Sequence, residues 1–118
     1  MTLGQSQREF THMVARLVMW AYENGYELTY GDAFRSPEQA AANAAKGIGI
    51  SNSLHGKRLA VDFNLFIDGV YQKNSKAYEP LGVFWESIGG SWGGRFKDAK
   101  GKPKPDGNHF SLAWRGVR

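Results

Sequence analysis

The sequence predicts a small α+β domain in which a short antiparallel sheet is flanked by helices. Three helical patterns and four short β-rich segments follow one another without the regular strand–helix alternation that is typical of a parallel sheet. Asp68-Gly69 reads as a two-residue turn, which makes the segments on either side of it antiparallel. The 118 residues suit one domain, 1–118, with no room for a second.

The N-terminal part is expected to form a helix, a strand and a second helix. Apolar side chains at three- and four-residue steps predict an amphipathic helix over 5–24; they are Phe10, Met13, Val14, Leu17, Val18, Ala21 and Tyr22. Aromatic and β-branched residues over 26–34 predict a strand. The pattern Ser-Pro-Glu-Gln is typical of a helix start and predicts a helix over 36–47.

A hairpin is expected over 59–72, with its turn at Asp68-Gly69. Apolar side chains on its first arm occupy alternate positions and so share one face; they are Leu59, Val61, Phe63, Leu65 and Ile67. Asp62 falls on the other face, which carries no Lys or Arg within the strand. A carboxylate in such a place needs a cation or several hydrogen-bond donors.

The C-terminal part is expected to contribute one more helix and one more strand. The helix is predicted over 78–90 and packs through Leu81, Phe84, Trp85 and Ile88. A Gly-rich turn over 89–96 and a Lys/Pro-rich loop over 97–105 follow. The last β-rich segment, 108–114, predicts the final strand.

Composition narrows the possible functions. The chain has no cysteine, so disulfides and thiolate metal sites are excluded. No apolar run could span a membrane and no signal peptide is visible, so we expect synthesis in the cytosol and no membrane insertion.

Fifteen Lys and Arg against eleven Asp and Glu give a net charge of +4, with the excess late in the chain. This favours a polyanion such as nucleic acid, cell wall or an anionic membrane, although a merely solvated basic loop fits equally well.

A metal ion would satisfy the carboxylate of Asp62 if neutral ligands reached it from elsewhere. His55, in the loop that enters the strand, and His109, at the start of the last strand, are the candidates. Two imidazoles and one carboxylate with an open position are the pattern of a catalytic zinc site. Because His-x6-Asp also occurs by chance, spacing alone leaves the metal site as one interpretation. His12 lies beside the apolar stripe of the first helix and is expected to be an ordinary surface histidine.

Asp106 lies three residues before His109, on a turn where it could take a proton from water. Asp-Gly is also a common turn dipeptide, so its position alone leaves that role open.

Four blocks of sequence together resemble the LAS-type zinc peptidases of the D-alanyl-D-alanine carboxypeptidase family, peptidase family M15. The blocks are "FRSPEQ", "SNSLHGKRLAVDFNLF", "WESIGGSWGGRFKD" and "PDGNHFSL", in this order. Within that family they are most similar to phage endolysins that act as L-alanyl-D-glutamate peptidases. The resemblance runs from about Tyr30 to Leu112.

The resemblance implies a role for each matched residue. It implies that His55, Asp62 and His109 bind one Zn²⁺ per chain, and that Asp106 is the catalytic acid and base. Arg35 would contact the substrate carbonyl and stabilise the developing oxyanion, a role that a fixed guanidinium can serve.

Two further matched positions are expected at the substrate site. Ser53 would support the ligand loop and lie beside the substrate. Trp92, in the Trp-Gly-Gly block, would be a packing or cleft-wall residue. The sequence departs from the family where many relatives have Gly four residues before the ligand aspartate, because Arg58 stands there. This departure predicts a different course of the loop.

The resemblance implies a monomeric zinc peptidase that lyses the bacterial cell wall by cutting the L-alanyl-D-glutamate bond of peptidoglycan stem peptides, with no nucleic-acid partner. The protein would be held in the host cytoplasm and reach the wall after holin-type release. Two rivals stay open. One is a D,D-carboxypeptidase or D,D-dipeptidase with the same ligands. The other is a non-catalytic, zinc-stabilised wall-binding module.

Overall fold

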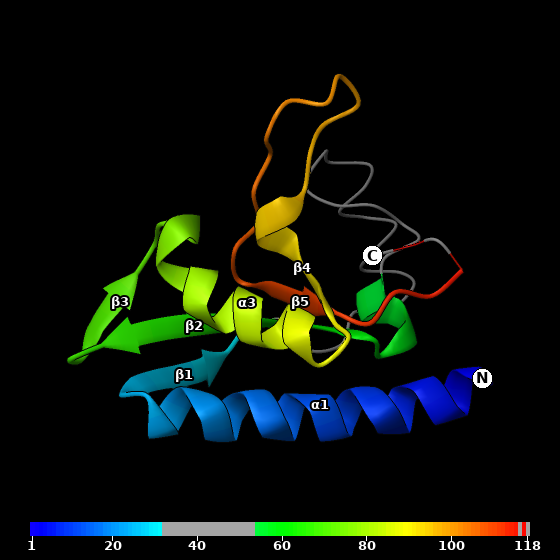
Figure 1. Ribbon diagram of the computed structural model, residues 1–118, viewed down its shortest axis with the longest axis horizontal. Helices are drawn as coiled ribbons and strands as arrows, with labels where there is room; N and C mark the ends of the chain where they lie inside the picture. The colour runs from blue at the N-terminus through cyan, green and yellow to red at the C-terminus, as the bar shows by residue number, and fades with distance from the viewer. Residues whose placement is uncertain (32–53, 116, 118) are drawn as a thin grey trace.

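Helix α1, Leu3–Glu23, runs along one side of the molecule and supports the sheet (Figure 1). The computed structural model describes residues 1–31, 54–115 and 117, and the helix expected over 36–47 lies outside them. The expected first helix is confirmed. It starts two residues before its predicted position because Thr2 and Gln5 form a reciprocal capping box.

Strand β2, Ala60–Ile67, is the centre of an antiparallel sheet in the order β1-β2-β5-β4. β1, Tyr26–Tyr30, pairs along one edge of β2. β5, His109–Ser111, pairs with the start of β2, and β3, Val70–Gln72, pairs with its end. The hairpin between β2 and β3 is confirmed. The small fold is therefore α+β, as the sequence predicts.

Helix α3, Glu79–Ser87, confirms the predicted C-terminal helix and follows the short helix η2, Ser75–Tyr78. The segment 89–96, expected to be a turn only, also contains strand β4, Ser91–Trp92, and the short helix η3, Gly93–Arg95. The turn expectation is wrong for β4, because this dipeptide pairs with β5 and buries its indole. In a stretch this rich in glycine, the local pattern hides that pairing.

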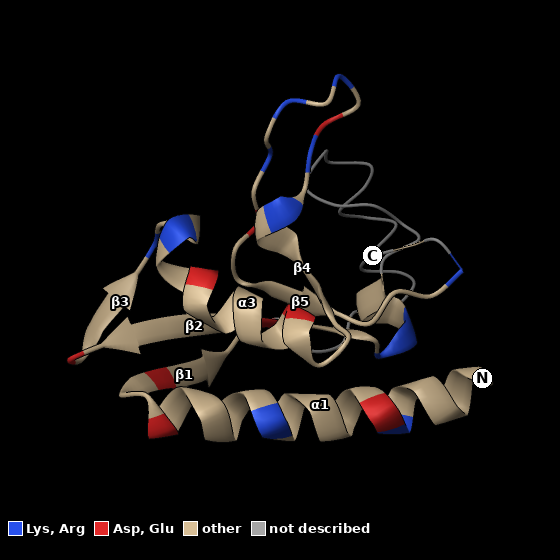
Figure 2. Ribbon diagram, in the orientation of Figure 1, with Lys and Arg blue, Asp and Glu red and all other residues tan. Residues whose placement is uncertain are grey.

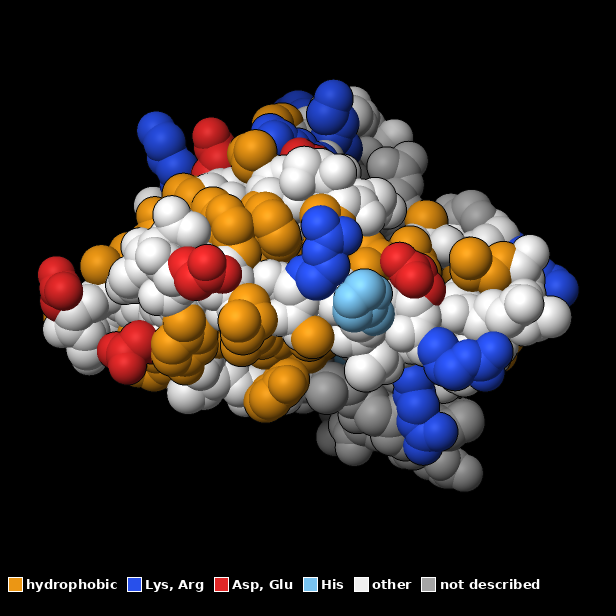
Figure 3. Space-filling model, turned by 60° about the horizontal axis from the view of Figure 1, so that its bottom comes forward, with side chains coloured by type: hydrophobic (Ala, Val, Ile, Leu, Met, Phe, Trp, Pro, Cys, Tyr) orange, Lys and Arg blue, Asp and Glu red, His pale blue; other side chains and the backbone are white. Residues whose placement is uncertain are grey.

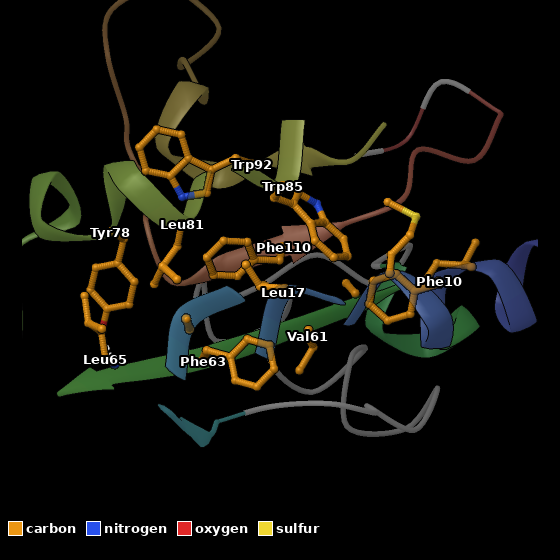
Figure 4. Packing of buried hydrophobic residues seen from close by; sticks show 14 of the residues in the cluster. Phe10, Leu17, Val61, Phe63, Leu65, Tyr78, Leu81, Trp85, Trp92 and Phe110 are labelled. Atoms are coloured by element: carbon orange, nitrogen blue, oxygen red, sulfur yellow. Dashed lines mark hydrogen bonds between the residues drawn. The ribbon is translucent and has the colours of Figure 1, made fainter. Parts of the chain in front are cut away.

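The hydrophobic core lies between the sheet and helices α1 and α3 (Figure 4). The rings of Phe10 and Phe110 both meet Trp85 edge to face, with centroids 5.7 and 5.9 Å away. The indole nitrogen of Trp85 donates to the carbonyl of Ser111 at 2.9 Å, so this fully buried ring leaves no polar atom unsatisfied. The core face of β2 consists of the alternating residues predicted for it, among them Val61, Phe63 and Leu65.

The outer surface of α1 carries hydrophobic side chains between isolated charges (Figure 3). Met19 and Tyr22 are exposed there, as is His12, which is therefore a surface histidine as expected. No helix in the described part of the chain is both long and apolar enough to cross a membrane.

Candidate metal centre

The short helix before β2 carries His55, whose side chain is buried. The short helix η1, Leu54–Lys57, is anchored by the buried side chain of Leu54, and the amide of Leu59 donates back to the Leu54 carbonyl at 3.0 Å. Arg58 closes this loop with φ +56°, in the left-handed region. The position at which the resemblance expects glycine therefore does need a left-handed residue, and arginine adopts that conformation here.

Sheet register brings Asp62 and His109 together. The two residues stand directly opposite each other on β2 and β5. The Asp62 carbonyl accepts from Gly31 on the β1 side, and the His109 amide donates to the Asp106 carbonyl. The pair therefore exchanges no backbone hydrogen bonds, and side chains of such pairs lie closest together.

The three predicted ligands form one cluster. Asp62 Oδ1 lies 3.4 Å from His55 Nε2 and 3.4 Å from His109 Nδ1. One donor atom from each residue falls within 4.8 Å of the other two. Both imidazoles are buried, and the Asp62 side chain is 18% exposed, so the cluster opens to solvent on the carboxylate side.

The electrostatics of the cluster favour a charged carboxylate. Burial raises the pKa of Asp62, but the hydrogen-bonding and Coulombic influence of His109 and His55 together outweighs it and lowers that pKa to about 2. In the described part of the chain, buried Asp62 Oδ1 and His109 Nε2 have no hydrogen-bond partner of good geometry. An acceptor left in this state is costly, and a cation shared with the imidazoles would satisfy it.

The donor set fits zinc. Two imidazoles and one carboxylate, brought from three separate segments, leave a fourth position for water or substrate. The cluster is thus a candidate metal site, and it is formed by the three residues that were proposed as ligands from the sequence.

The turn between Asp106 and His109 is held in place by hydrogen bonds to other segments of the chain. The amide of Asp106 donates to the Gly93 carbonyl at 2.8 Å, and the indole of Trp92 donates to the Gly107 carbonyl at 2.7 Å. The Gly107 amide donates to the Ser75 hydroxyl at 2.9 Å. Asp106 is exposed and its backbone is tied to His109, which agrees with a residue at the rim of the site.

Glycine is required at position 93 because η3 approaches this turn closely. A Cβ on Gly93 would overlap the carbonyl oxygen of Asp106 and lie 2.8 Å from the Cβ of His109. The Gly-rich block, which was expected to form a tight turn, therefore brings the backbone of η3 against the candidate ligand His109.

Trp92 belongs to the core side of the sheet. It pairs with Phe110, and Phe110 pairs with Val61, so the three side chains share the face opposite Asp62. The indole is 4% exposed and packs against Gly82 of α3. These contacts are those of a packing residue, and the substrate-binding role expected of Trp92 stays a prediction. Arg35 and Ser53 lie outside the described residues.

Sequence reasoning missed Phe96. Its ring lies 5.3 Å from the ring of His109, at an interplanar angle of 50°. Phe96 follows η3, and no local pattern in its Gly/Lys-rich surroundings marks it. The glycine pair of the Trp-Gly-Gly block was the available signal that this segment lies against another part of the chain.

An α+β fold with a His–Asp–His cluster on an antiparallel sheet defines a candidate metalloprotein. Residues 46–112, more than half of the chain, match the profile of the peptidase M15 family described as D-alanyl-D-alanine carboxypeptidase. The chain belongs to this family. Family and cluster together support a metal-binding peptidase.

Two solved structures show the same fold. The L-Ala D-Glu endopeptidase ChiX of Serratia marcescens superposes with a TM-score of 0.74 at 19% identity, covering 95% of this chain and 86% of its own. The second structure is a mutant of the vancomycin-resistance D,D-pentapeptidase VanY from a VanB-type cassette, in complex with Zn(II). It superposes with a TM-score of 0.60 at 18% identity, covering 88% of this chain and 70% of its own. No curated protein matches the sequence.

Proposed function

We propose that the protein is a zinc-dependent peptidoglycan peptidase that hydrolyses the L-alanyl-D-glutamate bond of murein stem peptides. The observation that carries the proposal is the meeting of His55, Asp62 and His109 within 4.8 Å, where a buried oxygen of Asp62 receives no well-aligned hydrogen bond from the described residues. Membership of a peptidase family gives this cluster its chemistry.

The chain's own residues would divide the work. His55, Asp62 and His109 would hold one Zn²⁺, which when bound supplies a Lewis acid that acidifies water and polarises a peptide carbonyl. Asp106, at the rim, would take a proton from the attacking water and deliver it to the leaving amine. Arg35 would place fixed positive charge beside the developing oxyanion.

The choice of bond rests on structural similarity. The L-Ala D-Glu endopeptidase matches more of this chain, and with a higher TM-score, than the D,D-pentapeptidase does. The alternative within the family is a D,D-carboxypeptidase or D,D-dipeptidase, since one ligand set serves all these reactions.

Digestion of purified murein fragments, followed by mass spectrometry of the new termini, tests the bond. Cleavage between L-Ala and D-Glu leaves a new amine on D-Glu and a new carboxylate on L-Ala. Hydrolysis should stop with a strong chelator and return with added Zn²⁺. Release of D-Ala or D-Ala-D-Ala instead would assign the alternative activity.

A second candidate is a non-catalytic, zinc-stabilised wall-binding module, which would keep the ligands and not need Asp106. Asp106→Ala separates the two. We expect about 100-fold or greater loss of hydrolysis with zinc content unchanged, the scale of a missing general acid and base. Asp68→Ala, at another exposed turn, is the control and should keep full activity. Full activity of Asp106→Ala would contradict its catalytic role.

As part of the same proposal, the protein acts as a phage endolysin that reaches the wall from the host cytoplasm after holin-type release. The support is the similarity of its sequence blocks to such enzymes. Expression in a bacterial host should lyse the cells only when the inner membrane is also permeabilised. Lysis without any membrane lesion would contradict this route.

A further inference from the structure

A lysine-rich hairpin projects from the body of the molecule between β4 and β5 (Figure 1). We define it as residues 96–104, which are closed by hydrogen bonds and include most of the expected Lys/Pro-rich loop 97–105. Its base is fixed where the Lys104 amide donates to the Phe96 carbonyl at 2.8 Å. Along it lie four exposed lysines (Figure 2), namely Lys97, Lys100, Lys102 and Lys104.

The tip of the lysine hairpin has a fixed conformation. The Asp98 amide donates to the Lys102 carbonyl at 2.9 Å, and the Gly101 amide donates to the Asp98 carbonyl at 3.0 Å. Asp98 Oδ1 accepts from the amides of Lys100 and Lys102 at 2.8 and 3.0 Å. Gly101 has φ +79°, which favours glycine. This turn geometry holds the lysines in place, so little backbone entropy is lost when they bind.

The charge of the lysine hairpin is directed to solvent. Its single acid, Asp98, is engaged with backbone amides at the tip. Within the described part of the chain, none of the four lysines forms an ion pair with an acid. Four ammonium groups on one short projection are therefore available to an anionic partner.

The base of the lysine hairpin adjoins the candidate metal centre. Phe96, its first residue, contacts the ring of His109 at 5.3 Å. Asp106 follows its last residue by two positions and is tied to Gly93. An anionic chain held along the hairpin would therefore lie next to the bond to be cut.

We propose that the lysine hairpin binds carboxylates of the murein polymer next to the stem peptide in the site. This inference rests on the proposed function and names the means by which the enzyme holds its polymeric substrate. Each exposed ion pair is weak, but several lysines against the repeated carboxylates of neighbouring stem peptides act together. Nucleic acid fits less well, because the hairpin's only aromatic ring is the one that contacts His109, leaving none to stack on bases.

Two matched triple variants test the proposal by co-sedimentation with murein sacculi stripped of phosphate polymers. The first neutralises the hairpin with Lys100→Gln, Lys102→Gln and Lys104→Gln. The control removes three exposed cations elsewhere with Arg8→Gln, Arg16→Gln and Lys73→Gln. Each lowers the net charge from +4 to +1. Binding should weaken roughly tenfold for the hairpin triple in low salt, since three weak ion pairs are lost, and much less for the control.

Further arms of the experiment identify the anion. Amidation of the sacculus carboxyl groups should reduce wild-type binding to the level of the hairpin triple, and high salt should remove the difference between variants. Equal binding of both triples would overturn the proposal. So would hairpin-dependent binding that favours double-stranded DNA or anionic lipid vesicles over sacculi.

The readout is independent of the proposed reaction. Binding to sacculi is measured in the cold without reference to cleavage, and cleavage is measured separately on a short soluble stem peptide. The hairpin triple should cut that short peptide at the wild-type rate, because one stem lacks the neighbouring carboxylates. Hairpin-dependent binding with no cleavage of any murein bond would refute the proposed function alone.

Discussion

At the residue scale, burial and charge oppose each other at Asp62. Burial alone would favour the neutral acid, but two imidazole nitrogens 3.4 Å from one oxygen hold the group as a carboxylate. A half-buried carboxylate between two imidazoles is suited to a divalent cation, because the ion's charge offsets the cost of desolvation.

Asp62→Asn should abolish tight zinc binding. The amide keeps the shape of the side chain and removes the negative charge, so we expect affinity to fall by more than about 100-fold, beyond the usual effect of an outer-shell partner. Competition with a chromophoric chelator measures this. Asn64→Ala, two residues along the same face, is the control and should bind zinc as wild type does. Equal affinity of Asp62→Asn and wild type would exclude Asp62 as a ligand.

The lowered pKa of Asp62 predicts how the metal-free protein responds to acid. Its folded pKa of about 2 lies below the ordinary value of 3.8, so the stabilisation is complete above about pH 4 and is lost as the pH falls towards 2. The loss amounts to about 2 kcal/mol of unfolding free energy. Urea unfolding from pH 5 to 2.5 should show a steeper decline for wild type than for Asp62→Asn. If the unfolding free energies of the two proteins fell in parallel with pH, the pKa of Asp62 would not be lowered in the folded state.

At the element scale, the local sequence pattern predicts most helices and strands, but it does not predict the residues at which they begin and end. The 3.6-residue stripe predicts α1, and the alternation from Leu59 to Ile67 predicts β2 with its faces correctly assigned. β4 was missed because two residues carry no periodicity. Its place depends on Phe110, which only the folded sheet brings opposite Trp92.

Contact between η3 and the Asp106 turn predicts the effect of Gly93→Ala. The added methyl would overlap the Asp106 carbonyl and crowd His109, so the turn must move. We expect destabilisation of about 1–3 kcal/mol, as for overpacked cores, together with weaker zinc binding. Gly4→Ala, in α1 with only an ordinary contact at 3.6 Å, is the control and should be neutral or slightly stabilising. Thermal unfolding and zinc titration report both effects.

At the scale of the whole molecule, the metal site joins segments that are distant in the chain. η1, β2 and β5 each supply one candidate ligand, so an ion bound by all three would stabilise the folded state and not the unfolded chain.

Zinc should therefore raise the stability of the protein measurably. At a free concentration 100 times the dissociation constant, binding to the folded state alone contributes about 2.7 kcal/mol, or a rise of several degrees in Tm. Scanning fluorimetry of metal-free protein with and without added Zn²⁺ measures the change. Asp62→Asn should show little shift. A shift of equal size in that variant would place the stabilising ion elsewhere.

The sequence by itself determined that Asp62 points away from the core, because alternation along a strand is a local property of the backbone. The resemblance of the sequence blocks to a peptidase family predicted that His55, Asp62 and His109 form one metal site. The spacing of these residues alone did not decide whether they meet. Only the tertiary structure brings the three side chains together. The β2–β5 register places Asp62 opposite His109, and the left-handed conformation of Arg58 turns the chain between His55 and β2. Register follows from burying Phe110 and Trp92 against the helices, and such burial depends on the whole folded chain.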